Sequence, residues 1–370
     1  MVLSIPLRRL VVTALSAGFL LLSITASHVS AQSDEETFAS QIARFSEPSG
    51  FFDTDNLISN ERTYLHVIDK LKHLSLSGGI YLGVGPDQNF SYIAQLQPER
   101  AYIIDIRRDN LLIHFLFKAL FEISPTRVEY VANLFGRPVP DDTSHWETAD
   151  IDQVVDFVDE TTLDNGQLLL VQQRINQQLR EFGVQLSMTD DETIARFHQI
   201  FANRGLSLQF RSLGRPPRPH YPTYRDIILA TDSRGVPSSY LASRTTYQFV
   251  RQLQLKDRII PIVGNFAGSH AIKTLGDYLS SEGKSVSAFY TSNVEFYLFQ
   301  NRLFSRYLNN LSRLPYKKNS VIIRSVFNQR RGFPANNAQS YSSAVVQDFR
   351  DFVTGFKSGK YRSYWDLAPK

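Results

Sequence analysis

The sequence predicts an α/β fold: a mostly parallel sheet with helices on both faces, interrupted by a helical insertion. Two observations lead to this fold class. Apolar stretches of strand length, such as residues 80–84 and 101–106, alternate with stretches of helical periodicity, as in repeated βαβ units. These apolar stretches are also continuous, which is typical of strands that a parallel sheet buries on both faces. The chain has 370 residues, 42% of them hydrophobic, enough for one large domain or two ordinary ones.

Residues 1–31 are predicted to be a secretory signal peptide. Arg8 and Arg9 precede an apolar run over residues 10–26, and small residues lie where a signal peptidase reads the chain, so cleavage is expected after Ala31. The alternative is an uncleaved anchor helix, the one membrane association that we expect. In both cases the rest of the chain is predicted to be exported, to the periplasm or the medium. The chain has no cysteine, which excludes disulfide bonds and fits export without demonstrating it.

Residues 32–76 are expected to form N-terminal helices, and residues 77–121 the first half of the sheet. The expected elements are, in order, helices over residues 34–45 and 60–74, a strand over 80–84, a helix over 89–97, a strand over 101–106 and a helix over 110–121. Ser59 and Asp109 are predicted to cap the helices that follow them, because Ser and Asp side chains accept hydrogen bonds from the free N–H groups of a helix start.

Residues 122–222 interrupt the alternation and are predicted to be a helical insertion or cap. Within this stretch, Thr189 and Glu192 have the spacing of a capping box for a helix over 192–203, and Gly205 is expected to end that helix. A short strand over 206–210 and a proline-rich connector complete the insertion.

Residues 223–370 are expected to hold the second half of the sheet and a C-terminal helix. The expected elements are strands over residues 259–263, 286–290 and 320–325, and helices over 269–282, 293–302 and 343–356. Pro261 indicates a strand start or an edge strand, because proline has no backbone N–H to donate to a neighbouring strand. Ser292 and Glu295 have the spacing of a capping box, and a related series, Ser59-Asn60-Glu61, occurs earlier in the chain.

A glycine-rich loop follows the first strand and suggests a ligand site. Gly83 and Gly85 lack a Cβ, so a ligand could approach the backbone, and the helix after the loop would present free N–H groups. Asp105 ends the second strand, where an acid commonly binds ribose hydroxyls. The predicted cofactor-binding residues are Gly83, Gly85, Asp87, Gln88, Asn89, Asp105 and Arg107. The alternative is a tight strand-to-helix turn in which Asp105 helps to cap the next helix.

This loop favours a nucleoside without phosphates over a dinucleotide. The pattern G-x-G-x-x-G would need glycine where Gln88 stands, and Asp87 at the mouth of a pocket would repel a pyrophosphate. S-adenosylmethionine fits better, because its methionine part is zwitterionic. That match is also incomplete. Methyltransferase loops of the form D/E-x-G-x-G-x-G have an acid at the position of Tyr81 and a glycine at the position of Asp87.

The ends of the later strands supply further polar and aromatic side chains. Asn265 follows the third strand between two glycines and is the candidate catalytic residue. The predicted substrate-binding residues are Arg108, Asn110, Phe266, Tyr290, Ser292, Asn293 and Glu295. The alternatives are a tight turn at Asn265, a solvated helix start at Arg107 and Arg108, and a capping role for Ser292.

Several other functions are not predicted. The eight histidines are scattered without the spacing of metal ligands, so no metal is expected. The G-x-S-x-G pattern of a nucleophile elbow is absent. The net charge of +4 falls to +2 without the two arginines of residues 1–31, and no long run of Lys or Arg suggests nucleic acid. A small-molecule ligand is therefore the expected partner.

Five stretches carry a family resemblance: SEPSGFFDTDNLISNERTYL, YLGVGPDQNFSYIA, AYIIDIRRDNLLIHFLFKALF, VGNFAG and AFYTSNVEFYLF. Together they resemble a bacterial family of unknown function whose members look like class I S-adenosylmethionine-dependent methyltransferases. The resemblance runs over most of residues 46–328 and implies a Rossmann-like, methyltransferase-type fold. It points to the residues selected above other than Phe266 and Tyr290, and to Gly264, as the pocket. Some relatives have Asp in place of Asn265, and an amide cannot replace an acid that acts as a base.

Three functions are consistent with these observations. The first is methyl transfer to a small molecule or a protein side chain, in which Asp105 holds the ribose, the glycine loop holds the methionine part and Asn265 orients the acceptor. The second is an exported binding protein or pseudoenzyme without catalysis. Tyr81 and Asp87 favour it, because they depart from the methyltransferase loop. The signal peptide favours it too, because S-adenosylmethionine is made in the cytoplasm. The third is an interaction protein that contacts a partner through the helical insertion.

Overall fold

The computed structural model describes residues 1–2, 36–216, 218–327 and 341–367. Residues 3–31 of the predicted signal peptide, with the predicted cleavage site after Ala31, lie outside the described residues. Within the described ranges, no helix is both long enough and apolar enough to cross a membrane. The described residues from Glu36 onwards belong to one compact unit.

A six-stranded sheet lies at the centre of this unit, in the order β3-β2-β1-β4-β5-β6. Its strands are β1 (Ile80–Gly83), β2 (Arg100–Asp105), β3 (Ile259–Val263), β4 (Val286–Ser292), β5 (Tyr316–Phe327) and β6 (Ser342–Asp348). Strands β1 to β5 run parallel to one another, and β6 runs antiparallel to β5. The expected α/β class with a mostly parallel sheet is therefore confirmed. The order changes direction between β1 and β4, which is where open α/β sheets bind ligands.

Helices lie on both sides of the sheet. The helices before β2 are α1 (Phe38–Phe45), the 3₁₀ helix η1 (Tyr64–Val67), α2 (Ile68–His73) and α3 (Gln88–Leu96). Those between β2 and β3 are α4 (Arg108–Ile123), α5 (Arg127–Phe135), η2 (His145–Glu147), α6 (Ile151–Glu160), α7 (Asn165–Glu181), α8 (Met188–Arg204), η3 (Gly205–Ser207), α9 (Tyr224–Ile228) and α10 (Arg244–Leu255). Those after β3 are α11 (Ala271–Ser281), α12 (Val294–Gln300), α13 (Phe304–Leu311), α14 (Phe349–Lys357) and η4 (Tyr364–Leu367).

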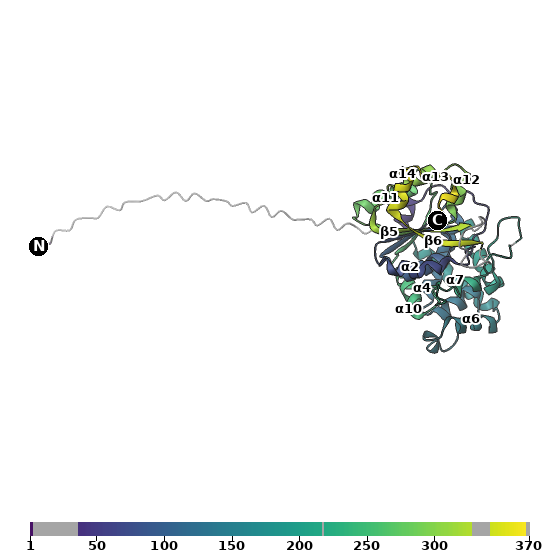
Figure 1. Cartoon of the computed structure of the whole chain (residues 1–370). Helices are drawn as coiled ribbons and strands as arrows, with labels where there is room; N and C mark the ends of the chain where they lie inside the picture. The colour runs from purple at the N-terminus through teal and green to yellow at the C-terminus, as the bar shows by residue number, and fades with distance from the viewer. Residues whose placement is uncertain (3–35, 217, 328–340, 368–370) are drawn as a thin grey trace. The chain divides into compact units, whose positions relative to one another are not determined.

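The core forms where these helices meet the sheet. Helices α11, α13 and α14 lie on one side of the strands and α2, α4 and α10 on the other (Figure 1). The continuous apolar strands are buried on both faces, as the sequence predicts, and β3 is buried at every position. Pro261 lies in β3 opposite Ile103, and β3 is an edge strand, so the indication from proline is confirmed.

Three predicted helix starts are wrong. Ser59 caps no helix, because its Oγ accepts the Glu61 N–H within a loop and the first helical turn begins only at Tyr64. Asp109 lies inside the first turn of α4, so it is not the cap. Helix α8 begins one turn early, because the capping box is formed by Ser187 and Asp190. The N-cap positions are held by Thr63, Arg107 and Ser187, and of these three only Ser187 makes a side-chain capping bond.

Two predicted elements change type. The expected helix over 343–356 is a strand followed by a helix, since β6 pairs with β5 through Asp348 and α14 begins at Phe349. Pairing with β5 supplies the backbone hydrogen bonds that a helix would otherwise provide, and the helical spacing of the apolar residues applies only from Phe349. The expected strand over 206–210 is a 3₁₀ turn followed by one bridge, between Gln209 and Thr223.

Candidate functional site

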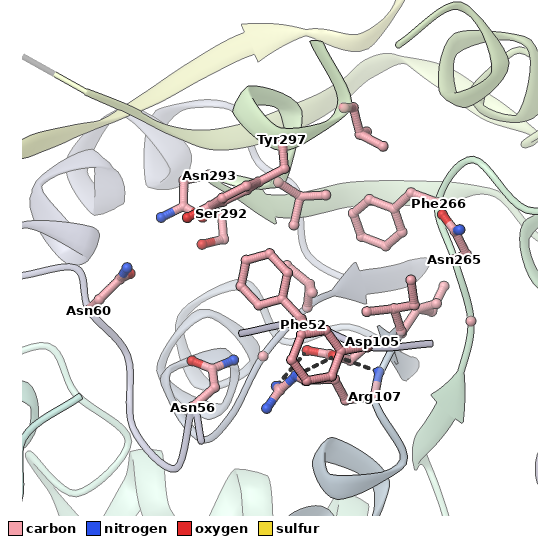
Figure 2. A pocket seen from close by; sticks show the side chains of 18 of the residues that line it. Phe52, Asn56, Asn60, Asp105, Arg107, Asn265, Phe266, Ser292, Asn293 and Tyr297 are labelled. Carbon is pink, nitrogen blue, oxygen red and sulfur yellow. Dashed lines mark hydrogen bonds and ion pairs between the residues drawn. The ribbon is translucent and has the colours of Figure 1, made fainter. Parts of the chain in front are cut away.

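A pocket lies beyond the carboxyl ends of β1 to β4, at the point where the strand order changes direction (Figure 2). Its cavity measures about 190 Å³. The predicted site residues that line it are Gly85, Gln88, Asp105, Arg107, Asn265, Phe266, Ser292 and Asn293. The predicted site residues outside its lining are Gly83, Asp87, Asn89, Arg108, Asn110, Tyr290 and Glu295. The topology thus brings together side chains that are far apart in the sequence.

Asp105 and Arg107 form a buried ion pair in the wall of this pocket (Figure 2). Asp105 Oδ1 accepts hydrogen bonds from the Arg107 backbone N–H at 2.9 Å and from Nε at 3.1 Å, and Oδ2 accepts one from Nη2 at 3.0 Å. Arg107 Nη1 also donates to the carbonyl oxygen of Asp55 at 3.2 Å. A pair with two parallel bonds has a fixed geometry. Because Asp105 Oδ2 accepts one of these bonds only, it can accept a further bond from a ligand hydroxyl.

The glycine at position 83 makes room for a side chain of the protein. A Cβ on Gly83 would lie 2.0 Å from Asn89 Oδ1. Asn89 is buried, accepts a bond from the Tyr81 hydroxyl at 2.9 Å and donates to the carbonyl oxygen of Val84 at 2.9 Å. The absent Cβ at Gly83 therefore serves internal packing and not the approach of a ligand. Gly85 differs, because it lines the pocket and has a φ of 84°, which only glycine adopts readily.

Asp87 lies in a buried cluster of tyrosines and not at the pocket mouth. The hydroxyls of Tyr224 and Tyr240 donate to its Oδ2 at 2.7 and 3.2 Å. Burial raises the pKa of Asp87 to about 6, although both tyrosine bonds oppose the rise. The expectation that Asp87 repels a pyrophosphate at the mouth is therefore wrong, because its carboxyl is fully buried.

Arg108 and Asn110 face away from the lining. Arg108 pairs with Asp190 of α8 through two bonds of 2.7 and 2.8 Å, and this guanidinium lowers the pKa of the Asp190 carboxyl. This pair connects the start of α4 to the helices that follow β2. Asn110 is buried, and neither polar atom of its side chain has a partner among the described residues.

The turn after β3 holds Asn265 by its backbone and by its side-chain oxygen. The Asn265 N–H donates to Glu47 Oε1 at 2.6 Å, and its Oδ1 accepts the Ala267 N–H at 2.9 Å. The amide nitrogen is the part of this side chain that is left to donate to a ligand. Phe266 packs edge-on against Phe289 with ring centroids 5.0 Å apart, so its ring is a fixed wall of the pocket (Figure 2).

The predicted capping box at the end of β4 is wrong. Ser292 is the last residue of the strand, its φ is 53°, and its Oγ donates to Glu61 Oε1. Asn293 is the N-cap of α12 and makes no side-chain capping bond. Glu295 accepts from Arg324 Nε at 2.6 Å, and both side chains are buried. Both side chains of the expected box therefore have other partners.

Sequence reasoning missed the second wall of the pocket, which comes from the loop before η1 and from α12. Its residues are Phe51, Phe52, Asn56, Ser59, Asn60, Tyr297 and Asn301. Phe52 and Tyr297 meet edge to face at 4.7 Å (Figure 2). Their role depends on a contact between residues far apart in the chain, so no local pattern indicates it.

The lining is mixed, with polar groups set among apolar side chains, and it carries no net charge. Asp105 and Arg107 are the charged side chains that line it, and they neutralise each other. The other polar groups are mainly amides and two serines, and the apolar part combines five aromatic rings with six aliphatic side chains. Such a lining suits a neutral or zwitterionic ligand with a flat ring. In the described part of the chain, no three His, Cys, Asp or Glu side chains gather as metal ligands would.

Comparison with known families identifies the chain. The model of a domain of unknown function (DUF7790) matches residues 57–144 and 206–367. The chain belongs to this family. The matched residues hold all six strands of the sheet and most of the pocket lining, whereas α6, α7 and α8 lie between the two matched segments. A search of curated proteins found none similar to the chain.

Proposed function

We propose that this protein is exported and binds a nucleoside-type ligand, S-adenosylmethionine being the first candidate, in a Rossmann-like fold of the methyltransferase type. The observation that carries the proposal is the pocket at the change of strand direction, where the ends of four parallel strands meet. Export is proposed from the pattern of residues 1–31 alone.

In this proposal, each wall of the pocket binds one part of the ligand. The free position on Asp105 Oδ2 accepts a ribose hydroxyl, with Arg107 keeping the carboxylate in place. The rings of Phe52 and Tyr297, which contact each other, together offer the base one aromatic surface, and Gln88 lies at the methionine part. The Asn265 amide donates to the acceptor of a methyl group. Methyl transfer needs mostly such positioning.

A second candidate is an exported binding protein without catalysis. Two observations favour it. Asp105 already accepts three hydrogen bonds from Arg107, so it has less capacity for a ligand than a free carboxylate. Asn265 is an amide, which cannot take a proton from an acceptor.

Calorimetric titration of the purified protein tests ligand binding. We expect S-adenosylmethionine to bind, and both Asp105→Asn and Phe52→Ala to weaken binding by about tenfold, the effect of one lost hydrogen bond or ring contact. Phe52→Ala leaves the buried ion pair intact, so it separates loss of binding from loss of stability. Asp159→Asn is the matched control, because Asp159 pairs with Arg225 at the surface.

Absence of binding by the wild-type protein would overturn the nucleoside proposal. Binding without methyl transfer to any acceptor of a broad panel would decide for the binding protein. Fractionation of cells that express the tagged full chain tests export, and full-length protein in the cytoplasm would contradict it.

A further inference from the structure

The hydroxyl of Ser292 is bonded to a buried carboxyl at the pocket wall. Ser292 lines the pocket (Figure 2), and its Oγ donates to Oε1 of Glu61, which is not among the lining residues. Glu61 is 2% exposed. Since the Ser292 proton points to Glu61, the lone pairs of Oγ are free for an atom bound in the pocket. This is the arrangement of a nucleophile and its base.

Among the described residues, no cation is found with the groups that act on the buried Glu61. The titratable groups that act on it from the surrounding elements are phenols: Tyr81 of β1, Tyr92 of α3, Tyr290 of β4 and Tyr364 of η4. The hydroxyls of Tyr290 and Ser325 lie near enough to lower the pKa of Glu61, yet burial dominates and raises that pKa to about 7. Glu61 Oε2 has no hydrogen-bond partner within the described residues.

A carboxyl in this state is a good general base. A base works best when its pKa is close to the pH at which it acts, because it is then both deprotonated and basic enough. The usual carboxylate is too weak a base to take a proton from a serine. Burial without a cation makes Glu61 a stronger base.

The backbone at Ser292 is also unusual. Its φ of 53° is in the left-handed region, which is unfavourable for a residue with a Cβ. Gln97 has a similar φ, but it is the C-cap of α3, where this conformation is common. Ser292 ends a strand and directly precedes the N-cap of α12. Strained backbone at such a junction is often part of a functional site.

We propose that Ser292 is a nucleophile activated by Glu61 and that it takes the acyl group of neutral esters bound in the pocket. The nucleoside-binding proposal and this one are independent, and Ser292 would react in this way even if the pocket bound no S-adenosylmethionine. The G-x-S-x-G pattern is absent, so the junction from β4 to α12 would provide the sharp turn in another way.

The reaction balances without any further reactant except water. Ser292 Oγ forms a bond to the carbonyl carbon while its proton passes to Glu61 Oε1. The carbon–oxygen bond to the alcohol then breaks, and the leaving oxygen takes the proton from Glu61. This leaves an acyl ester on Ser292 and a carboxylate at Glu61. Water then attacks the ester carbon and gives a proton to Glu61. The bond from that carbon to Ser292 Oγ breaks, Glu61 returns the proton to Oγ, and the acid leaves with both side chains restored.

The lining selects the substrate class. A charged ester would meet no free countercharge, since Asp105 and Arg107 neutralise each other. The rings of Phe52, Phe266 and Tyr297 suit an ester that carries an aromatic or other apolar group. Neutral aryl or alkyl esters are therefore the expected substrates.

Labelling by a neutral fluorophosphonate tests the proposal without knowledge of the natural substrate. The probe forms a bond from Ser292 Oγ to phosphorus, fluoride leaves, and the proton goes to Glu61 and then to solvent. We expect mass spectrometry of the labelled full chain to place the adduct on Ser292. The rate should rise with pH through about 7 and level off above, because the carboxylate is the base.

Three variants complete the test. Ser292→Ala should abolish the adduct, and Glu61→Gln should slow labelling by about 100-fold or more, because the amide cannot take the proton. Ser287→Ala is the matched control, a serine of the same strand whose Oγ donates to the carbonyl oxygen of Ile80, and it should label at the wild-type rate. A wild-type protein without an adduct at Ser292 would overturn the proposal, whether or not the variants fold. Equal labelling of wild type and Glu61→Gln would overturn the role of Glu61.

Discussion

Two buried glutamates near the pocket have similar sequence surroundings and different environments. Glu61 follows Ser59-Asn60, and Glu295 follows Ser292-Asn293-Val294. Glu295 accepts two hydrogen bonds from Arg324, which is as buried as the glutamate itself. Glu61 accepts one bond from a serine hydroxyl, and no cation is among the groups that shift its pKa.

The difference shows two ways in which a fold can bury a carboxyl. A buried arginine keeps the charge and makes the pair part of the core, where the loss of one partner leaves the other unpaired. Without a cation, the carboxyl holds its proton to a higher pH and becomes reactive in the neutral range. Glu295 is therefore a structural group, and Glu61 is the group that can exchange a proton with the pocket through Ser292.

The largest expected effect is the difference in stability between the two variants in which one of these glutamates is replaced by glutamine. Glu295→Gln leaves Arg324 charged and buried, so we expect the free energy of unfolding to fall by about 3–5 kcal/mol. Glu61→Gln leaves no charge unpaired and should cost less than about 1 kcal/mol at about pH 5. Urea denaturation of the two variants measures both values. Similar losses at the two sites would contradict the distinction.

The pH dependence of stability should separate the two glutamates next. Burial raises the pKa of Glu61 from its ordinary 4.5 to about 7 in the folded protein, so the folded state binds more protons between these values and stability falls as pH rises through them. Glu61→Gln removes this loss. The variant should gain up to about 3 kcal/mol over wild type between about pH 5 and pH 8. An unchanged difference across this range would contradict the raised pKa.

Tyr290→Phe should give the smallest effect. The Tyr290 hydroxyl is buried without a partner in the described residues and lowers the pKa of Glu61. Its removal should therefore move the midpoint of the labelling pH profile upwards, by less than about one pH unit, with stability changed by less than about 1 kcal/mol. A downward shift would show that the hydroxyl acts on Glu61 in another way. Ser287→Ala again serves as the control.

Much of the fold was predictable because its determinants are local. Continuous apolar runs mark the strands of a buried parallel sheet, and Pro261 marks an edge strand. Helix starts were harder, since any nearby Ser, Thr or Asp can take the cap, as Ser187 does for α8. The stretch from Ser342 to Asp348 is a strand because β5 offers it hydrogen bonds, and no local pattern contains that information.

The candidate site was predictable only where topology leads to it. The strand ends at Gly85, Asp105, Asn265 and Ser292 meet in one pocket because parallel strands have their carboxyl ends at the same edge. What each side chain does there depends on its partners. Arg107 takes up most of the hydrogen-bonding capacity of the Asp105 carboxylate, and the Asn89 side chain fills the space beside Gly83.

By itself, the sequence determined the α/β class, most strand positions and the edge of the sheet where the pocket lies, because hydrophobic periodicity and chain direction are properties of the chain alone. The protonation and reactivity of the buried acids were decided only by the tertiary structure. Glu61 and Glu295 differ because Arg324 packs against Glu295, whereas the described groups that act on Glu61 are uncharged hydroxyls. Burial and the distance to a cation set the pKa of a carboxyl, and both arise only when distant segments meet.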